Sequence, residues 1–364
     1  MSGRFGRLAL GAMALTLVAL GMQPGRASTS QGIGAQLVLG NLSTSDSFTF
    51  APDGRIFWGA RVSGNIHLYD PDTGSDTIFF TIPNLQHTFD QGLLGLALHP
   101  NYPATPIVYA YATRVDHGEL HNEIVTMRDA GGVGTGFRVV FVTNTIAATA
   151  HQGGRIEFGP DGMLYAMVGD GENAGSAQNT DLTSGKILRL TDRGKPAPGN
   201  PFRTPIFAYG FRNGFGFDFD PQTGLLWDTD NGPACNDEID LVQSGLNYGW
   251  GSHGNCTQPP EPPANTNQDG PNPVFPLAYY TPPIAVTGAA FCSGCGLPDS
   301  DGTLFVGAFN TGELRRYVLT PDRLGIASEE VVYTHGGAII GLEQAPDGTL
   351  YFSTGDGIWR LISV

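Results

Sequence analysis

One stretch in the middle of the chain combines the residue types that acid–base chemistry needs. It reads HQGGRIEFGPDGMLYAMVGDG, so His151 precedes one strand-like segment and Asp170 ends the next. Neighbouring antiparallel strands would place this carboxylate against the imidazole, and an aspartate that holds one ring nitrogen leaves the other as a general base near neutral pH. Spacing alone favours a plainer explanation, a surface histidine and a turn aspartate. His151 and Asp170 are nevertheless the candidate catalytic pair of the chain.

Arg212 and Asn213 form a second candidate group. They follow the strand-like AYGF and precede the next predicted strand. A guanidinium at that edge can clamp a carboxylate through two parallel hydrogen bonds. The alternative, an arginine that only stabilises its loop, fits the spacing equally well.

A third group points to a hard cation. Proline has no N–H to donate to a neighbouring strand, so the carbonyls of Gly232 and Pro233 are expected to be free of sheet hydrogen bonds. Asp237 and Glu238 follow closely in the sequence. Calcium prefers oxygen ligands of this kind. The pattern therefore predicts a calcium site at these residues.

The elements that carry these groups belong to a repeat. Each copy has an apolar strand, a turn of the P-D-G type, a second strand that ends in Gly or Asp, and a third strand. Proline presets the first corner of such a turn, aspartate bonds its own backbone, and glycine takes the positive φ. Six copies begin at Phe48, Leu93, Arg155, Phe215, Thr287 and Ile340.

Six copies of one unit predict an all-β fold, a six-bladed β-propeller of four-stranded antiparallel sheets, in which ring closure removes exposed sheet edges. Residues 35–40 would close the ring as the outer strand of the last blade. A pair of β-sandwiches is the competing fold, but it does not predict six copies of one turn. Residues 255–281 are rich in Pro and Asn, so we expect a long ordered loop, either a wall of a binding site or a solvated spacer.

The first residues have the pattern of an export signal. Arg4 and Arg7 precede the apolar run 8–22, and a small-residue cleavage site ends at Ala27. The run is short for a membrane anchor, which is the alternative. We therefore expect a signal peptide at 1–27 and a single propeller domain at 28–364, exported to the periplasm or outside the cell, with no membrane insertion after cleavage.

The net charge and the cysteine content limit which partners and which cellular compartment the protein can have. Removing residues 1–27 takes away three arginines and no acidic residue, which lowers the formal net charge from −15 to −18. A chain this acidic repels nucleic acid and anionic lipid.

The four cysteines fit structural disulfides in an oxidising compartment, and Cys235–Cys256 with Cys292–Cys295 is the most local of three pairings. A redox or zinc site is the alternative, but neither a βαβ pattern nor a histidine at ligand spacing accompanies the CSGC motif.

Taken together, the motifs resemble the soluble glucose/sorbosone dehydrogenase family. In chain order they are GLLGLALHP, HQGGRIEFGPDGMLYAMVGDG, GKILRL, AYGFRNGFGFDFDP, NGPACNDEIDL and GLNYGW, and the resemblance runs from about residue 34 to the C-terminus. It implies a six-bladed propeller that binds pyrroloquinoline quinone (PQQ) and Ca²⁺ and oxidises a small-molecule sugar. An external electron acceptor would be its second partner.

The resemblance also implies roles for the matching residues. His151 would be the base that takes the proton of the anomeric hydroxyl while hydride moves to the quinone, and Asp170 would orient it. Arg212 and Asn213 would contact the cofactor.

Two calcium sites are implied in the same way. The carbonyls of Gly232 and Pro233 would hold the ion beneath the quinone. Glu238 and the backbone of Tyr248 would hold a second, structural ion.

The second half of the cofactor site departs from the family pattern. Asn310 stands where the resemblance implies a lysine, Ala338 and Ile340 stand where it implies arginines, and Gln91 lies one residue nearer to GLLG than the family's cofactor-binding glutamine. Three missing cations around a tricarboxylate remove charge-assisted hydrogen bonds worth about 1.5–3 kcal/mol each. Gln91 and Asn310 are the predicted cofactor contacts of this half. The residues that could compensate for the missing charge are Arg315, Arg316 and His335.

The sequence thus predicts an exported, quinone-dependent aldose dehydrogenase. Two alternatives use the same scaffold. A calcium-dependent propeller lactonase would need a metal-bound water and carboxylates that converge on the central channel. A non-catalytic propeller that binds glycans or a protein partner would explain the missing cations, since propellers host many functions.

Overall fold

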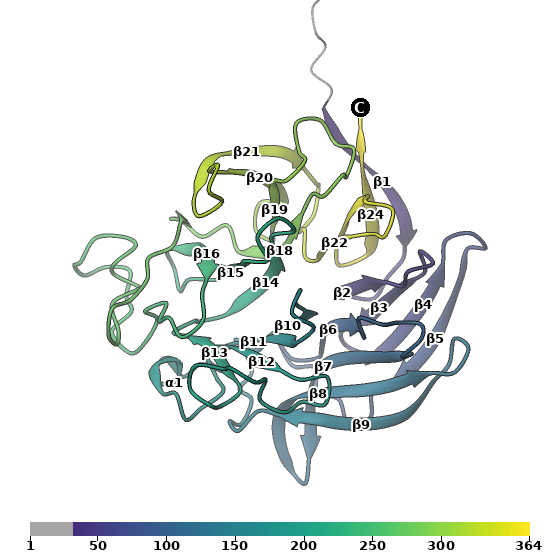
Figure 1. The fold of residues 1–364 in the computed structure, drawn as a ribbon, viewed down its shortest axis with the longest axis horizontal. Coiled ribbons are helices and arrows are strands. Elements are labelled where there is room, and N and C mark those ends of the chain that lie inside the picture. The colour runs from purple at the N-terminus through teal and green to yellow at the C-terminus, as the bar shows by residue number, and fades with distance from the viewer. Residues whose placement is uncertain (1–31) are drawn as a thin grey trace, which may run out of the picture. The chain divides into compact units, whose positions relative to one another are not determined.

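The computed structural model describes residues 32–364, which form six four-stranded antiparallel sheets. The sheets surround a common centre, with β2, β6, β10, β14, β18 and β22 innermost (Figure 1). The predicted all-β, six-bladed propeller of four-stranded antiparallel sheets is therefore confirmed. The predicted signal peptide, residues 1–27, lies outside the described residues.

Each blade uses consecutive strands, except that the last blade recruits the first strand. Blades 1 to 3 contain, from the centre outwards, β2 (Ser45–Phe50), β3 (Ile56–Ala60), β4 (Asn65–Asp70) and β5 (Ser75–Thr81); β6 (Leu93–Leu98), β7 (Ile107–Asp116), β8 (Glu119–Asp129) and β9 (Gly134–Val142); and β10 (Gly153–Phe158), β11 (Leu164–Val168), β12 (Lys186–Leu190) and β13 (Ile206–Tyr209). Blades 4 to 6 contain β14 (Gly214–Phe219), β15 (Leu226–Asp230), β16 (Asp237–Val242) and β17 (Ala278–Tyr280); β18 (Val286–Phe291), β19 (Leu304–Ala308), β20 (Glu313–Leu319) and β21 (Ile326–Thr334); and β22 (Leu342–Gln344), β23 (Leu350–Ser353), β24 (Gly357–Ser363) and β1 (Ile33–Gly40). A single short helix in the described part of the chain, α1 (Ala174–Gln178), follows β11.

The P-D-G turns join the two innermost strands of blades 1, 3 and 6. Gly54, Gly162 and Gly348 each donate a backbone hydrogen bond of 2.9 Å to the carbonyl three residues earlier. Their φ values are 88°, 74° and 90°, which only glycine adopts without strain. The aspartate before each glycine accepts the N–H two residues further on. The recurring tripeptide is therefore the local cause of the repeated hairpin.

Strand β1 closes the ring. It pairs with β24, from Ile33 opposite Ser363 to Gly40 opposite Gly357. The prediction that residues 35–40 form the outer strand of the last blade is confirmed. Main-chain hydrogen bonds thus join the two ends of the described chain in one sheet.

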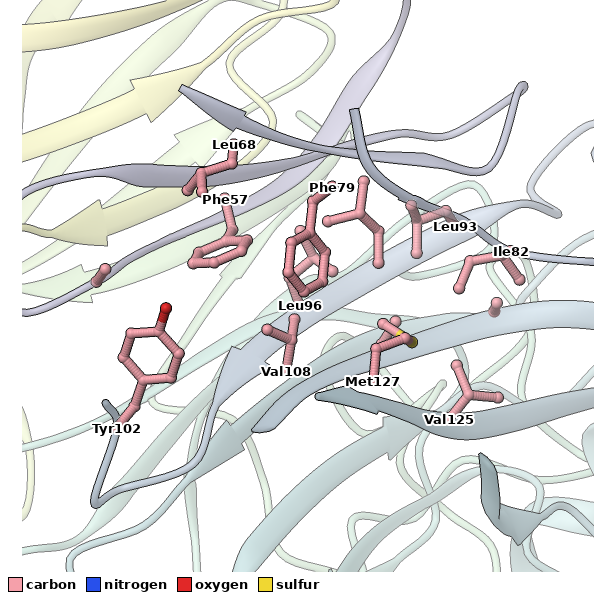
Figure 2. Close-up of a cluster of buried hydrophobic side chains, with 14 residues drawn as sticks. Phe57, Leu68, Phe79, Ile82, Leu93, Leu96, Tyr102, Val108, Val125 and Met127 are labelled. Atoms are coloured by element: carbon pink, nitrogen blue, oxygen red, sulfur yellow. The ribbon is translucent and has the colours of Figure 1, made fainter. Parts of the chain in front are cut away.

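The apolar core lies between neighbouring blades. Between blades 1 and 2, Phe57 and Phe79 pack against Leu96 and Val108 (Figure 2). The two phenyl rings meet edge to face at 5.1 Å. Strands β3, β11 and β19 are buried at every position, as expected for sheets covered on both faces. This packing fixes the positions at which the inner strands begin.

Both disulfides have the pairing expected as most local, Cys235 with Cys256 and Cys292 with Cys295. Within residues 32–364, the structure has no helix with the length and apolar character needed to cross a membrane.

Candidate active site

A cavity of about 400 Å³ lies at the centre of the ring, at the end where the inner strands begin. All six blades contribute to its wall, with Ser47, Leu94, Gly153, Asn213, Gly288 and Gly341 as one residue from each. Phe89 and Phe309 also line it, although they are 71% and 53% exposed. A concave site with apolar walls and a few polar groups is typical of cofactor and small-molecule sites.

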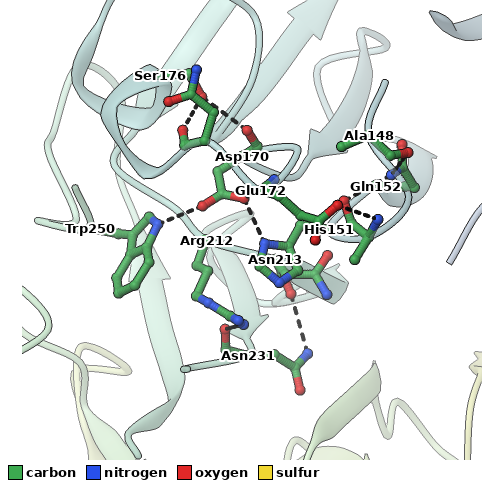
Figure 3. A network of polar contacts seen from close by, with 12 residues as sticks. Ala148, His151, Gln152, Asp170, Glu172, Ser176, Arg212, Asn213, Asn231 and Trp250 are labelled. Atoms are coloured by element: carbon green, nitrogen blue, oxygen red, sulfur yellow. Dashed lines mark hydrogen bonds and ion pairs between the residues drawn. The ribbon is translucent and has the colours of Figure 1, made fainter. Parts of the chain in front are cut away.

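His151 lies beside this cavity, directly before two wall residues, and is paired with Asp170. Its Nδ1 is 2.7 Å from Asp170 Oδ1 (Figure 3). The buried Asp170 carboxylate also accepts hydrogen bonds of 2.8 Å from the Glu172 N–H and the Trp250 indole. The carboxylate is thus fixed from three sides and holds the imidazole in one orientation. Because Nε2 forms no hydrogen bond within residues 32–364, it is free to act as a base.

The backbone at His151 depends on close contacts with glycine. His151 itself has a left-handed φ of 58°, and its N–H donates to Asp90 at 3.0 Å. A Cβ on Gly169 would lie 2.1 Å from the His151 carbonyl, and one on Gly153 would lie 2.6 Å from the Met167 carbonyl. A larger residue at either glycine would push His151 and the start of β10 away from Asp170.

Asp230 positions Arg212 and Asn213. Its carboxylate accepts both of their backbone N–H groups, at 2.7 and 2.6 Å. Burial raises the pKa of Asp230 to about 6, and these two hydrogen bonds oppose the shift. The Asn213 side chain lines the central cavity and accepts the Gly153 N–H at 3.3 Å.

The Arg212 guanidinium points towards the other candidate group. It lies over the Trp250 ring at 5.6 Å and donates to the carbonyls of Asn231 and Gly232, at 2.9 and 2.8 Å. One of the two carbonyls predicted to bind calcium is therefore bonded to an arginine in this structure.

A small cavity of about 10 Å³, with room for one water molecule or ion, lies beside Arg212. Gly232, Pro233 and Glu238 all line it, so the structure brings together residues that the sequence assigned to two separate sites. Thr266 and Asn267 form part of the same wall. Two residues of the loop 255–281 therefore line a cavity, which favours the wall over the solvated spacer.

Asn267 lies between Glu238 and the Tyr248 carbonyl, the two predicted ligands of the second calcium ion. Its Nδ2 donates to Glu238 Oε2 at 2.9 Å and to the Tyr248 carbonyl at 2.7 Å. Asp237 is engaged elsewhere, since it accepts the Gly232 N–H at 3.0 Å and the Ala285 N–H at 2.6 Å. Across residues 32–364, no three His, Cys, Asp or Glu side chains converge as a metal site. A cation here would depend on carbonyl and amide oxygens as much as on carboxylates.

Gln91 and Asn310 do not line the central cavity. The buried Gln91 amide donates to the Ala148 carbonyl at 2.6 Å and accepts the Thr88 N–H at 3.2 Å, so it ties two loops together. Asn310 is exposed, and its Nδ2 faces the Pro283 carbonyl at 3.3 Å. Their role as cofactor contacts stays a prediction.

Two arginines that the sequence reasoning did not assign to the cofactor line the cavity. Arg61 follows β3 and pairs with Asp46 at 2.9 Å, and Arg155 lies on β10 and pairs with Glu343 at 2.8 Å. The sequence could have indicated this role, because both arginines lie on or near the inner strands of the predicted repeat. The three residues expected to compensate are engaged elsewhere: Arg315 and Arg316 pair with glutamates, and His335 packs on Trp359.

Asp46 makes the charge beside Arg61 dependent on pH. Burial raises the pKa of Asp46 to about 7, Arg61 opposes this shift, and Asp90 adds to it. Near neutral pH the Asp46 carboxyl therefore carries only part of a negative charge.

The chain is similar in sequence and in fold to known sugar dehydrogenases. A family model for glucose/sorbosone dehydrogenase matches residues 42–362. Aldose sugar dehydrogenase YliI of Escherichia coli (strain K12) is 27% identical over 87% of this chain and 89% of that protein. Quinoprotein glucose dehydrogenase B of Acinetobacter calcoaceticus is 30% identical over 61% of this chain and 53% of that protein. The PQQ-bound aldose sugar dehydrogenase of Streptomyces coelicolor is 28% identical and superimposes with a TM-score of 0.78, covering 92% of this chain and 98% of that one.

Proposed function

The chain belongs to the glucose/sorbosone dehydrogenase family, and from this premise we propose that it is a PQQ-dependent aldose dehydrogenase. It oxidises the anomeric carbon of an aldose sugar. The observation that carries the proposal is the His151–Asp170 pair beside a cavity to which all six blades contribute.

The central cavity offers the cofactor space and hydrogen-bond donors, and Asp46 and Asp90 line the same wall. PQQ is a planar tricarboxylate, and a cavity of about 400 Å³ with Arg61, Arg155 and Asn213 in its wall offers guanidinium and amide donors for it. These arginines lie on other blades than the cations that the family resemblance implies. When bound, the quinone supplies the electrophile that accepts a hydride from the sugar.

His151 and Asp170 supply the proton chemistry. His151 Nε2 accepts the proton of the anomeric hydroxyl, and the charge left on that oxygen favours departure of the hydride from the same carbon. Asp170 keeps Nδ1 protonated and stabilises the imidazolium that forms. Loss of a proton and a hydride converts the cyclic aldose to a lactone, and the electrons then pass to an external acceptor.

Calcium and export belong to the same proposal. Gly232, Pro233 and Glu238 around a cavity of one-ion size support a calcium site, which would exchange the present bonds of Arg212 and Asn267 for bonds to the ion. The two disulfides support export to an oxidising compartment after removal of residues 1–27.

The test is turnover by the purified protein after reconstitution with PQQ and Ca²⁺. We expect dye reduction with free aldoses and none with methyl glycosides, whose anomeric oxygen has no proton. Lactone hydrolysis that needs calcium but not the quinone would support the lactonase instead. Absence of any quinone effect on dye reduction would leave the non-catalytic propeller.

A further inference from the structure

Blade 4 has four buried carboxylates on one face of two neighbouring strands. Asp228 and Asp230 share a face of β15, and Glu238 and Asp240 share a face of β16, because alternate residues of a strand point the same way. The register places Asp228 opposite Asp240, and Asp230 opposite Glu238. None of the four is more than 6% exposed.

Two of these carboxylates have partners and two have none. Asp230 accepts two backbone N–H groups, and Glu238 accepts hydrogen bonds from a threonine and an asparagine. All four carboxylate oxygens of Asp228 and Asp240 are buried without a hydrogen-bond partner anywhere in residues 32–364. Unpartnered buried carboxylates are among the costliest features that a protein core can contain.

The position of the pair increases that cost. Side chains directly opposite each other on antiparallel strands have Cβ atoms about 4.5–5.5 Å apart, so both carboxylates reach the same space, and like charges so placed repel. Neighbouring positions on this face, Leu226 and Val242, pack into the apolar cluster with Phe217.

We propose that Asp228 and Asp240 bind a buried divalent cation of the calcium class. One dication neutralises both carboxylates and supplies a partner for all four oxygens. Calcium fits better than magnesium, because it accepts irregular sets of oxygen ligands, whereas Mg²⁺ requires a near-ideal octahedron and usually keeps several waters.

The site is separate from the calcium sites that the family resemblance implies. Neither Asp228 nor Asp240 lines the cavity of about 10 Å³ beside Glu238. They form the next pair along the strands, about 7 Å from the Asp230–Glu238 pair. A cation there would fasten β15 to β16 and so steady Asp230, which holds the backbone of Arg212 and Asn213. The proposal does not depend on the redox function.

The experiment counts calcium ions without the quinone. The wild type, the Asp228→Asn/Asp240→Asn double variant and a Glu238→Gln control are equilibrated with Ca²⁺, freed of unbound ion and measured by elemental analysis. We expect the double variant to hold one Ca²⁺ less per chain than the wild type, and the same two substitutions made in the Glu238→Gln background to remove one further Ca²⁺ from that variant. Equal calcium in wild type and double variant would overturn the proposal, as would a wild type that binds no calcium.

Thermal unfolding gives a second readout that does not depend on counting. In a calcium chelator, the double variant should unfold at a higher temperature than the wild type, because two amides replace two repelling carboxylates. Calcium should raise the Tm of the wild type more than that of the double variant. The single variant Asp240→Asn should bind calcium at this site about tenfold or more weakly. An identical response of all three proteins to the chelator would contradict the assignment.

Discussion

His151 is held through one ring nitrogen and is free at the other, and its replacement tests the role of the free nitrogen. His151→Gln removes the base but leaves the cavity wall in place. We expect kcat for aldose oxidation to fall by about 10²- to 10⁴-fold, the usual contribution of a positioned general base. Dye-reduction kinetics measure this loss, and absorbance titration with PQQ checks that the cofactor still binds. A variant with wild-type kcat would show that another group takes the proton.

Asp46 gives cofactor binding a pH dependence of known sign. Its folded pKa is about 7, so the carboxyl is neutral below that pH and becomes an anion as the pH rises through it. The added charge beside Arg61 opposes a tricarboxylate, so PQQ affinity should fall between pH 6 and 8 by about five- to tenfold at an effective dielectric constant near 20. Calorimetric titrations across this range measure the change. In the Asp46→Asn variant, PQQ affinity should not decrease over this pH range. A decrease as large as in the wild type would show that another titrating group causes it.

Single residues of the site were predictable where they share one hairpin. His151 and Asp170 are 19 positions apart, and the P-D-G turn between their strands brings them together. Trp250 donates a hydrogen bond to Asp170 from 80 positions away. No motif in the sequence indicates that these two residues come into contact. Arg61 was missed for the same reason, since it reaches the cavity from a different blade than the motif that carries His151.

At the scale of elements, the loop 255–281 depends on its anchors. Cys256 ties the start of the loop to Cys235, at a sequence separation of 21, and Thr266 and Asn267 bond Glu238. The length and composition of this segment predicted an ordered loop. They could not predict which wall it forms, because the contacts that decide this lie on β16.

Loss of the Cys235–Cys256 disulfide should destabilise the fold more than loss of the second one. Chain-entropy arguments give about 3 kcal/mol for a separation of 21 and below about 2 kcal/mol for a separation of 3. The Cys235→Ser/Cys256→Ser protein should therefore unfold at lower denaturant than its matched control, Cys292→Ser/Cys295→Ser. Equal losses in equilibrium unfolding would mean that the loop is anchored mainly by its hydrogen bonds.

At the scale of the whole molecule, Arg155 joins blades across the centre of the ring. It lies on β10, pairs with Glu343 of β22 at 2.8 Å and with Glu157 at 3.4 Å, and faces Asp218 of β14 in a shared cavity. One guanidinium thus compensates three half-buried carboxyls from three blades. The fold itself was predictable because ring order follows chain order, whereas this central cluster was not.

Arg155→Met should destabilise the fold by about 1–3 kcal/mol at pH 8, because half-buried carboxylates lose their counter-charge and solvent screens part of the loss. Burial raises the pKa of Glu343 to about 7, with Arg155 opposing the shift. Protonated Glu343 needs no partner, so the loss should be smaller at pH 5.5 than at pH 8. Denaturant unfolding at both pH values measures it. Adding Glu343→Gln should restore part of the stability at pH 8, and no recovery would indicate that packing rather than charge is lost.

Cofactor binding in the central cavity can be measured by calorimetric titration of the wild type with PQQ in the presence of Ca²⁺, beside the Arg61→Met variant. If the six-blade cavity is the cofactor site, the wild type binds one PQQ per chain at micromolar concentration or below, and Arg61→Met binds it about tenfold or more weakly, as expected for loss of a charge-assisted hydrogen bond. No binding by the wild type at micromolar PQQ would show that the protein is not a PQQ enzyme. Binding that Arg61→Met leaves unchanged would place the cofactor elsewhere.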